Sequence, residues 1–151
     1  MSLRWATLDD TDVIVDLILN EKDHFVHGHL LTNTATRDFV IQHLVKPRQI
    51  AVSLVAVDLD ECIVGLFFGL RAVLPMTETP VAIEVIWWVD SKYRRAGVSH
   101  EIKDAAENWA KLVGCHYLHF TASNTVDLDL LSRYYKINGF VETERNFLKA
   151  I

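Results

Sequence analysis

The chain has 151 residues, half of them hydrophobic, and a formal net charge of −5. This length predicts one domain, spanning residues 1–151, around a single core. The acidic balance argues against a nucleic-acid partner, because neutralising phosphates requires clustered Lys and Arg. The longest apolar run, I-V-G-L-F-F-G-L, is far shorter than the ~20 residues that span a bilayer, so we expect no membrane partner either.

The start of the chain and its cysteines favour a reducing compartment. M-S-L-R-W-A-T-L-D-D turns acidic where a signal peptide would carry a basic start and an apolar run. The two cysteines, Cys62 and Cys115, lie in apolar stretches, where a buried free thiol is the usual state. We therefore expect a cytoplasmic protein.

The first half of the chain predicts a strand, two helices and a hairpin. A short strand over 3–7 precedes a helix that Asp9 or Asp10 caps and that runs to about residue 20. A polar, His-bearing connection then leads to a second helix over 34–45, which carries Phe39, Ile41, Leu44 and Val45. Residues 49–57 and 62–74 are rich in β-formers and flank the turn D-L-D-E, which indicates an antiparallel hairpin.

The second half alternates strands with helices. A strand over 81–89 is followed by a helix whose apolar residues recur at helical spacing, and Gly114 caps its C-terminus. A strand over 115–122, a helix over 126–135 and a last extended segment from Gly139 to Phe147 complete the chain. The helix that follows the strand over 81–89 has an apolar face that comprises Val98, Ile102, Ala105, Trp109 and Leu112. The order β-α-α-β-β-β-α-β-α-β predicts an α+β fold, a mixed, mostly antiparallel sheet flanked by helices.

The junction Y-R-R-A-G-V-S, residues 93–99, separates the strand over 81–89 from the helix that follows it. The first N–H groups of a helix are unpaired and carry the positive end of the helix dipole, so they can hold a phosphate. Gly97 has no Cβ to block that approach, and Arg94 and Arg95 add positive charge. The alternative is that Gly97 merely permits a tight turn and that both arginines are solvated.

This junction resembles the R/Q-x-x-G-x-G/A motif of the GNAT (GCN5-related N-acetyltransferase) superfamily, which follows the fourth strand and opens the third helix. L-S-R-Y-Y-K-I-N-G-F, residues 131–140, is similar to the later Y-x-x-x-G-F signature of that family, and L-R-W-A-T-L-D-D-T-D to its common start. The element order matches over nearly the whole chain. Two positions depart from the pattern: Ser99 replaces the usual Gly or Ala, and the Asn expected about two helical turns before the motif Tyr is absent, the nearest being Asn124.

The resemblance implies that acetyl-CoA is the cosubstrate. In the family its pyrophosphate lies on the cradle and its pantetheine arm enters a V-shaped opening between the fourth and fifth strands, here 81–89 and 115–122. An acceptor amine then attacks the thioester directly in a ternary complex. The cofactor-binding residues that this implies are Val89, Arg94, Arg95, Ala96, Gly97, Val98, Ser99 and Asn124.

The resemblance also implies two catalytic residues. Tyr135 matches the family Tyr that faces the sulfur of the cofactor and could protonate the leaving thiolate; the alternative is a core aromatic, with Tyr134 as the more deeply packed of the pair. Glu84, the one acid in the apolar strand, is the candidate base, although it could equally lie at an exposed strand start. Strict alternation puts Glu84 on one face with Ile86 and Trp88, unless a bulge, common in this strand of the family, shifts the register.

The acceptor is expected to be a small-molecule or peptide amine. His24 and His27 lie in the connection that helps to wall the family's acceptor pocket, and Trp88 is a third candidate; solvated histidines and a core tryptophan are the alternatives. The His24–His29 segment lacks a completed set of ligands, so we expect no metal. A rival interpretation is a catalytically inactive GNAT-fold protein that binds a partner protein. A homodimer paired through the last strands is compatible with either.

Overall fold

The computed structural model describes residues 1–25, 27–122, 127–144 and 149. These residues build one sheet of five strands in the order β1-β2-β3-β4-β5. The strands are β1 Ser2–Trp5, β2 Ala51–Val57, β3 Ile63–Val73, β4 Pro80–Val89 and β5 Tyr117–His119. Neighbours pair antiparallel except β4 and β5, which are parallel, so the predicted mixed, mostly antiparallel sheet is confirmed.

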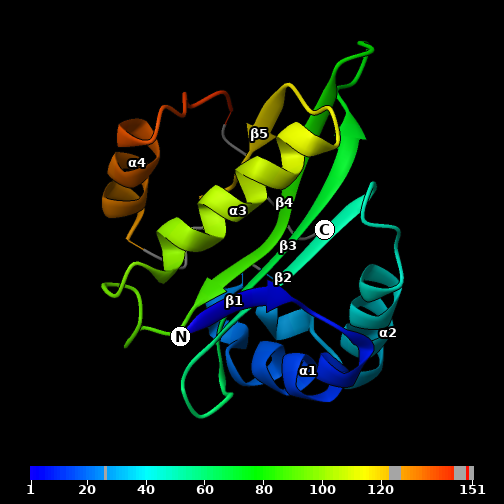
Figure 1. Cartoon of the computed structure of the whole chain (residues 1–151), viewed down its shortest axis with the longest axis vertical. Helices are drawn as coiled ribbons and strands as arrows, with labels where there is room; N and C mark the ends of the chain where they lie inside the picture. Colours follow the sequence, from blue (N-terminus) through cyan, green and yellow to red (C-terminus); the bar gives the residue numbers. More distant parts are fainter. Residues whose placement is uncertain (26, 123–126, 145–148, 150–151) are drawn as a thin grey trace.

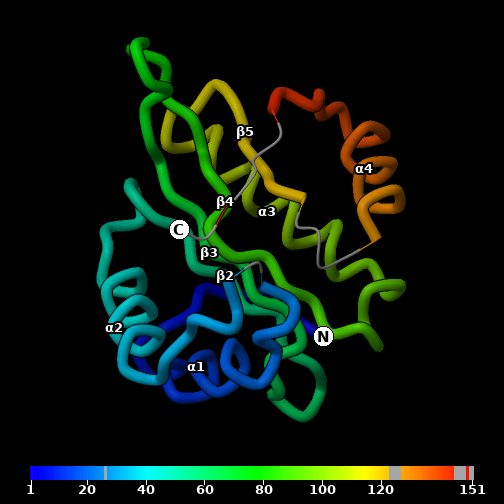
Figure 2. The backbone as a smooth tube through the Cα atoms, turned by 180° about the vertical axis from the view of Figure 1, so that it is seen from behind, coloured from blue at the N-terminus to red at the C-terminus, as the bar shows by residue number. Residues whose placement is uncertain are grey.

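Helices cover both faces of this sheet. They are α1 Thr11–Asn20, α2 Asn33–Leu44, α3 Val98–Leu112 and α4 Leu128–Ile137, with single turns of 3-10 helix at η1 Leu8–Asp10, η2 Lys22–His24 and η3 Gly28–Leu30. α3 lies in front of the sheet in Figure 1, whereas α1 and α2 lie in front when the molecule is seen from behind in Figure 2. α4 stands to one side, next to the N-terminal half of α3 (Figure 1). Within the described residues, no helix is long and apolar enough to cross a membrane.

A polar corner joins β1 to α1. The guanidinium of Arg4 donates to both carboxylate oxygens of Asp10, at 2.8 and 2.9 Å, and the Thr7 N–H donates to the same carboxylate at 2.8 Å. The Arg4 hydrogen bonds hold the pKa of Asp10 below its ordinary value, against the opposing effect of burial. This corner fixes the direction in which α1 leaves the sheet.

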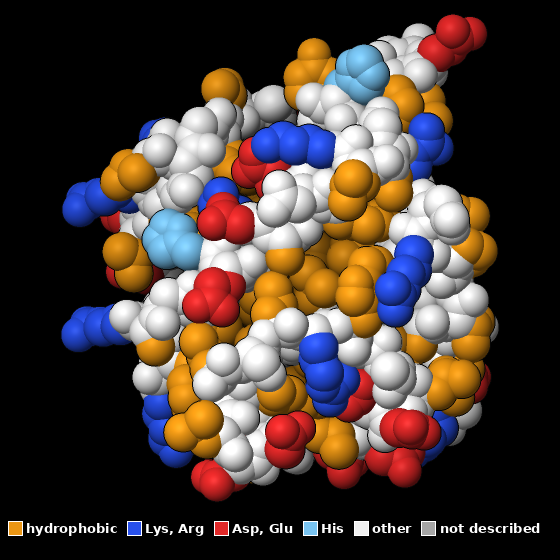
Figure 3. All heavy atoms as spheres, in the orientation of Figure 1, with side chains coloured by type: hydrophobic (Ala, Val, Ile, Leu, Met, Phe, Trp, Pro, Cys, Tyr) orange, Lys and Arg blue, Asp and Glu red, His pale blue; other side chains and the backbone are white. Residues whose placement is uncertain are grey.

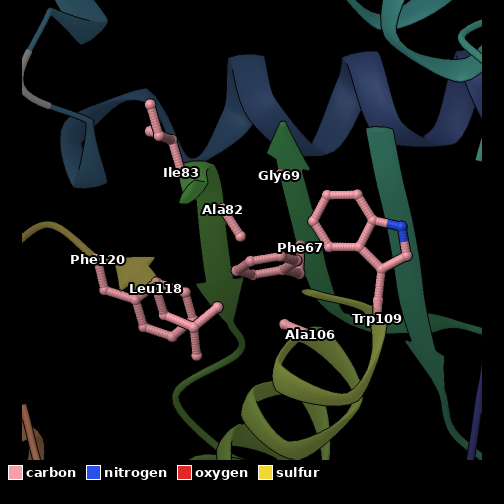
Figure 4. A pocket seen from close by; sticks show the side chains of 8 residues that line it. All are labelled: Phe67, Gly69, Ala82, Ile83, Ala106, Trp109, Leu118 and Phe120. Carbon is pink, nitrogen blue, oxygen red and sulfur yellow. The ribbon is translucent and has the colours of Figure 1, made fainter. Parts of the chain in front are cut away.

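Each face of the sheet has its own apolar cluster. The cluster under α3 includes Phe67, Ile102 and Trp109, and the cluster under α1 and α2 includes Ile14, Val40 and Phe68. Figure 4 shows the first cluster, with Phe67, Ala82, Leu118 and Phe120 gathered between the strands and α3 while Ile83 points away. On the face drawn in Figure 3, hydrophobic side chains gather in a central hollow and charged side chains surround it. β4 lies between the two apolar clusters and contributes side chains to both.

β3 and β4 lose their register at one residue. Phe68 pairs with Ile86 and Gly69 pairs with Glu84, so Val85 has no partner opposite it and forms a β-bulge. Val85, Ile86 and Trp88 therefore pack toward α1 and α2, while Trp87 packs toward α3. Of the two alternatives, the bulge is confirmed and strict alternation is not: Glu84 shares its face with Ala82, opposite to Ile86 and Trp88.

The structure corrects several details of the predicted elements. Cys62 is exposed, because it lies at the end of the β2–β3 turn. Leu112 is 87% exposed, because it is the last residue of α3, and Ala106 and Ala110 complete the buried face instead. Phe39 is partly exposed on α2, whose buried residues are Thr36, Val40 and His43.

Two predicted strands are shorter than expected. β5 ends at His119 and not at residue 122. Residues 140–144 contain no strand, and the rest of the predicted last strand includes 145–148, which lie outside the described residues.

Candidate active site

A cleft of about 860 Å³ opens beside the C-terminal half of β4. One wall comes from η2, η3 and α2, with Phe25, Leu31 and Phe39 among its residues. The opposite wall comes from the start of α3 and from α4. The β-bulge lies on its floor, because Glu84, Val85 and Ile86 all line the cleft.

The cleft lies where β4 and β5 part. Their ladder spans only Val81–Ile83 paired with Tyr117–His119. At the next step the Glu84 side chain intervenes, and its Oε2 accepts the Thr121 N–H at 3.1 Å. The strands therefore diverge beyond Ile83, and the carboxylate lies at the apex of the opening.

Burial has a large effect on the acidity of Glu84. Loss of solvent raises the pKa of this carboxyl to about 7, and the Thr121 N–H lowers it only in part. A carboxyl group with that pKa is divided between its two protonation states at neutral pH. It can therefore accept and return a proton under ordinary conditions.

Tyr135 reaches the same residue from α4. Its hydroxyl donates to the Thr121 carbonyl at 2.9 Å. Burial raises the pKa of Tyr135 far above its usual value, with smaller contributions from the charge of Glu84 and from Tyr134. The phenol is thus fully protonated at neutral pH and acts as a hydrogen-bond donor.

The junction after β4 forms an open turn at the start of α3. Gly97 is the N-cap, with φ of 87°, and a Cβ there would meet no atom within 4 Å. In the part of the chain that the structure describes, the N–H groups of Gly97, Val98 and Ser99 donate to no protein acceptor, whereas His100 and Glu101 both donate to the Gly97 carbonyl. Free N–H groups beside an uncovered glycine fit an anionic group such as a pyrophosphate.

The side chains of the junction have different surroundings. Arg94 lines the cleft, and its Nε donates to the Val89 carbonyl at 3.0 Å, at the end of β4. Ser99 and Val89 also line the cleft. Arg95 and Ala96 are exposed outside it, and the Val98 side chain is fully buried in the core beneath α3, so any contact from Val98 to a cofactor is limited to its backbone. Asn124 lies outside the described residues.

The predicted acceptor residues lie on the opposite wall. His24 and His27 line the cleft from η2 and from the turn before η3, and His24 Nδ1 is 2.9 Å from Glu21 Oε2. Trp88 lines it from β4 and is 8% exposed. The structure therefore brings these three residues to the same cleft as Glu84 and Tyr135. Among the described residues, no group of three or more His, Cys, Asp or Glu side chains could hold a metal ion.

Sequence reasoning missed several residues of the cleft. Tyr134, expected in the core, lines the cleft, and its hydroxyl lies 3.4 Å from His100 Nδ1. Thr121 contributes through backbone groups, which no side-chain motif reveals. Thr36, on α2, was not predicted as a site residue, because nothing in its sequence context indicates that the helix borders a cleft.

A family model, the acetyltransferase (GNAT) family, matches residues 21–140. The chain therefore belongs to the GNAT acetyltransferase family. A comparison with curated proteins found no significant match.

Solved structures share the fold across the whole chain. A probable acetyltransferase is 21% identical, with a TM-score of 0.77, and the match covers 100% of this chain and 98% of that one. The aminoglycoside antibiotic 6'-N-acetyltransferase of Acinetobacter haemolyticus is 24% identical, with a TM-score of 0.73 and coverages of 100% and 99%. The aminoglycoside N-acetyltransferase AAC(6')-Iy, solved in complex with the bisubstrate analogue CoA-S-monomethyl-acetylneamine, is 18% identical, with a TM-score of 0.75 and coverages of 99% and 97%.

Proposed function

We propose that this protein transfers the acetyl group of acetyl-CoA to an amine, in a ternary complex and without a metal. The observation that carries the proposal is the meeting of Glu84 and Tyr135 at Thr121, where β4 and β5 part. One cleft reaches from these groups to Arg94 and Ser99 at the junction. Membership of the GNAT family and the CoA-bound neighbour support the same activity.

The junction would hold the pyrophosphate of acetyl-CoA. The N–H groups of Gly97, Val98 and Ser99 have no protein acceptor among the described residues, and they carry the positive end of the α3 dipole. Arg94 and Arg95 would supply charge at the mouth. Within the described residues, the Arg94 guanidinium donates to the Val89 carbonyl through Nε, and its terminal nitrogens remain available to donate.

Glu84 would act as the base. An alkyl ammonium has a pKa of ~10.4, so generating the free amine at neutral pH costs about 4 kcal/mol. With a pKa of about 7, Glu84 is present as the carboxylate in a large fraction of molecules, and it can take that proton directly or through one water. Acetyl-CoA supplies a thioester whose carbonyl carbon bonds to the amine nitrogen as the C–S bond breaks.

Tyr135 would donate to the departing sulfur, for which its single hydroxyl proton must turn away from the Thr121 carbonyl that it contacts in the structure. Its raised pKa makes complete proton transfer to a thiolate unfavourable, so its hydroxyl acts mainly by hydrogen-bonding the negative charge that develops. The nitrogen loses two protons on the way from ammonium to amide: Glu84 would take the first and release it to solvent, and the second equals the proton that the CoA thiolate gains. Ammonium and thioester thus become amide, thiol and one proton in solvent.

Binding of acetyl-CoA is the first experiment. A ligand present at about 100 times its Kd adds ~2.7 kcal/mol to the free energy of unfolding and should raise the Tm by several degrees. An amine panel is then assayed for CoA release. A Tm unmoved by saturating acetyl-CoA would overturn the proposal and favour a catalytically inactive, partner-binding protein.

A further inference from the structure

The acceptor side of the cleft is mainly apolar. Its side chains from η2, η3 and α2, and those from β4 beyond Glu84, are largely aromatic or aliphatic. They include Phe25, Leu30, Leu31, Phe39, Ile86 and Trp88. Such a wall stabilises an apolar body by removing its surface from water, at about 25 cal/mol per Å².

Three hydrogen-bonding groups of this wall are buried and make no hydrogen bond within the described part of the chain: the Thr36 hydroxyl and the indole N–H groups of Trp87 and Trp88. Trp87 packs toward α3, so Thr36 and Trp88 are the two on the side of α1 and α2. Thr36 is 4% exposed and Trp88 is 8% exposed, and both residues line the cleft. A buried donor without a partner costs ~1–3 kcal/mol, and an oxygen atom on a bound molecule recovers that free energy once the side chain turns its donor into the cleft.

The cleft has little negative charge. Among its described lining residues the carboxylates are Glu84 and Asp127, and Asp127 already accepts the Leu130 N–H at 3.0 Å as the N-cap of α4. The residues outside the described part of the chain include no Asp or Glu. Arg94 adds a cation to the same cleft. A molecule with several ammonium groups would therefore place unpaired charges against apolar surface, which is strongly unfavourable.

We propose that the acceptor is a monoamine carried on a compact aromatic or branched apolar body that bears an oxygen acceptor, and not a polycation such as an aminoglycoside. Its amine lies at Glu84, its body lies against the wall built by Phe25, Phe39 and Ile86, and its oxygen accepts from Trp88 or Thr36. This inference rests on the proposed acetyl transfer and narrows its acceptor. It separates this chain from its aminoglycoside-acetylating neighbours, whose likeness is one of fold.

The test measures binding, so that it does not depend on turnover. The full chain is saturated with CoA, and calorimetry gives the Kd of phenethylamine, of its three ring-hydroxylated isomers and of neamine. We expect at least one hydroxylated isomer to bind tenfold more tightly than neamine and severalfold more tightly than phenethylamine. Neamine binding as tightly as every aromatic amine, or no aromatic amine binding at all, would overturn the proposal.

Three variants sharpen the test. Thr36→Val keeps the shape of the side chain and removes the hydroxyl, and Trp88→Phe removes the indole N–H. At least one of them should reduce the preference for the hydroxylated isomer over phenethylamine to less than twofold; an unchanged preference in both contradicts the role of these donors. Ala35→Glu adds a carboxylate to the wall at the third residue of α2, where Glu suits a helix whose N-cap is Thr32. It should tighten neamine binding.

The acetyl-CoA measurement separates the two proposals. If acetyl-CoA raises the Tm and neamine binds preferentially, the proposed acetyl transfer stands and the assignment of a monoamine acceptor is wrong. A Tm unmoved by acetyl-CoA removes the proposed function itself, whatever amine binds.

Discussion

Glu84 and Tyr135 bind the two backbone groups of one residue: Thr121 donates its N–H to Glu84 and accepts from the Tyr135 hydroxyl. A candidate base on β4 and a candidate donor on α4 are therefore held by a third element, the segment that follows β5. The negative charge of ionised Glu84 also disfavours ionisation of Tyr135 and so raises the pKa of its phenol. Neither side chain can shift far without breaking a bond to Thr121.

The pH dependence of the reaction should report Glu84. Its carboxylate form accepts the proton, so kcat/KM should rise through pH 7, the value to which burial raises its pKa, and then level off. Glu84→Gln should lower kcat by ~10²–10⁴-fold and abolish that limb. Steady-state rates between pH 5.5 and 9 check this, with the Tm shift by acetyl-CoA as the control for folding. A limb unchanged in the variant would assign it to another group.

Tyr135→Phe tests the proton donor. Removing the hydroxyl should lower kcat by ~10²-fold or more while the Kd of acetyl-CoA stays within twofold. Tyr134→Phe is the matched control, because it lies next to Tyr135 on α4 and also lines the cleft. A larger loss in the control would exchange the assigned roles of the two tyrosines.

Gly97→Ala tests the phosphate cradle, and Gly114→Ala is its control. Both glycines have positive φ, 87° and 76°, and both have open space where a Cβ would stand, so each substitution should cost ~1–2 kcal/mol of stability through backbone strain alone. They flank the same helix, but only Gly97 lies among the free N–H groups. We expect the Kd of acetyl-CoA to rise at least tenfold for Gly97→Ala and less than twofold for Gly114→Ala. Equal effects would mean that strain, and not a cradle, explains the loss.

The fold was predictable because its hydrophobic periodicities are long and its turns carry clear markers. α3 follows the junction after β4 as expected, and the D-L-D-E turn joins β2 to β3 as expected. The β4 bulge was harder to predict from the sequence, since one unpaired residue leaves the pattern I-E-V-I-W-W unchanged. Backbone contributions such as those of Thr121 could not be predicted from the sequence, because they depend on tertiary position and not on side-chain type.

His43 should make stability fall in acid. Its ring is buried, stacks on Phe68 at 4.4 Å and bonds the Val52 carbonyl through Nε2 at 3.2 Å; burial holds its pKa below the ordinary value. The unfolded chain therefore binds a proton that the folded chain resists, and stability present above pH ~6.5 is lost as the pH falls, at up to ~1.4 kcal/mol per unit. Denaturant unfolding from pH 8 to 5 in a Glu84→Gln background measures the slope, because the raised pKa of Glu84 acts in the opposite direction over this range. His43→Gln should flatten it; an equal slope in the variant would point to other groups.

The two halves of the cleft come from separate stretches of the chain. The part of the acceptor wall that comes from η2, η3 and α2 precedes β2, whereas the junction and α4 follow β4, and the β4 bulge is where they meet. Changes within residues 21–39 can therefore alter which amine fits while the groups around Thr121 and Gly97 keep their positions. Under the proposed function, acceptor choice and cosubstrate binding would thus be free to vary independently, and grafting this segment from a relative would be a direct way to exchange one acceptor for another.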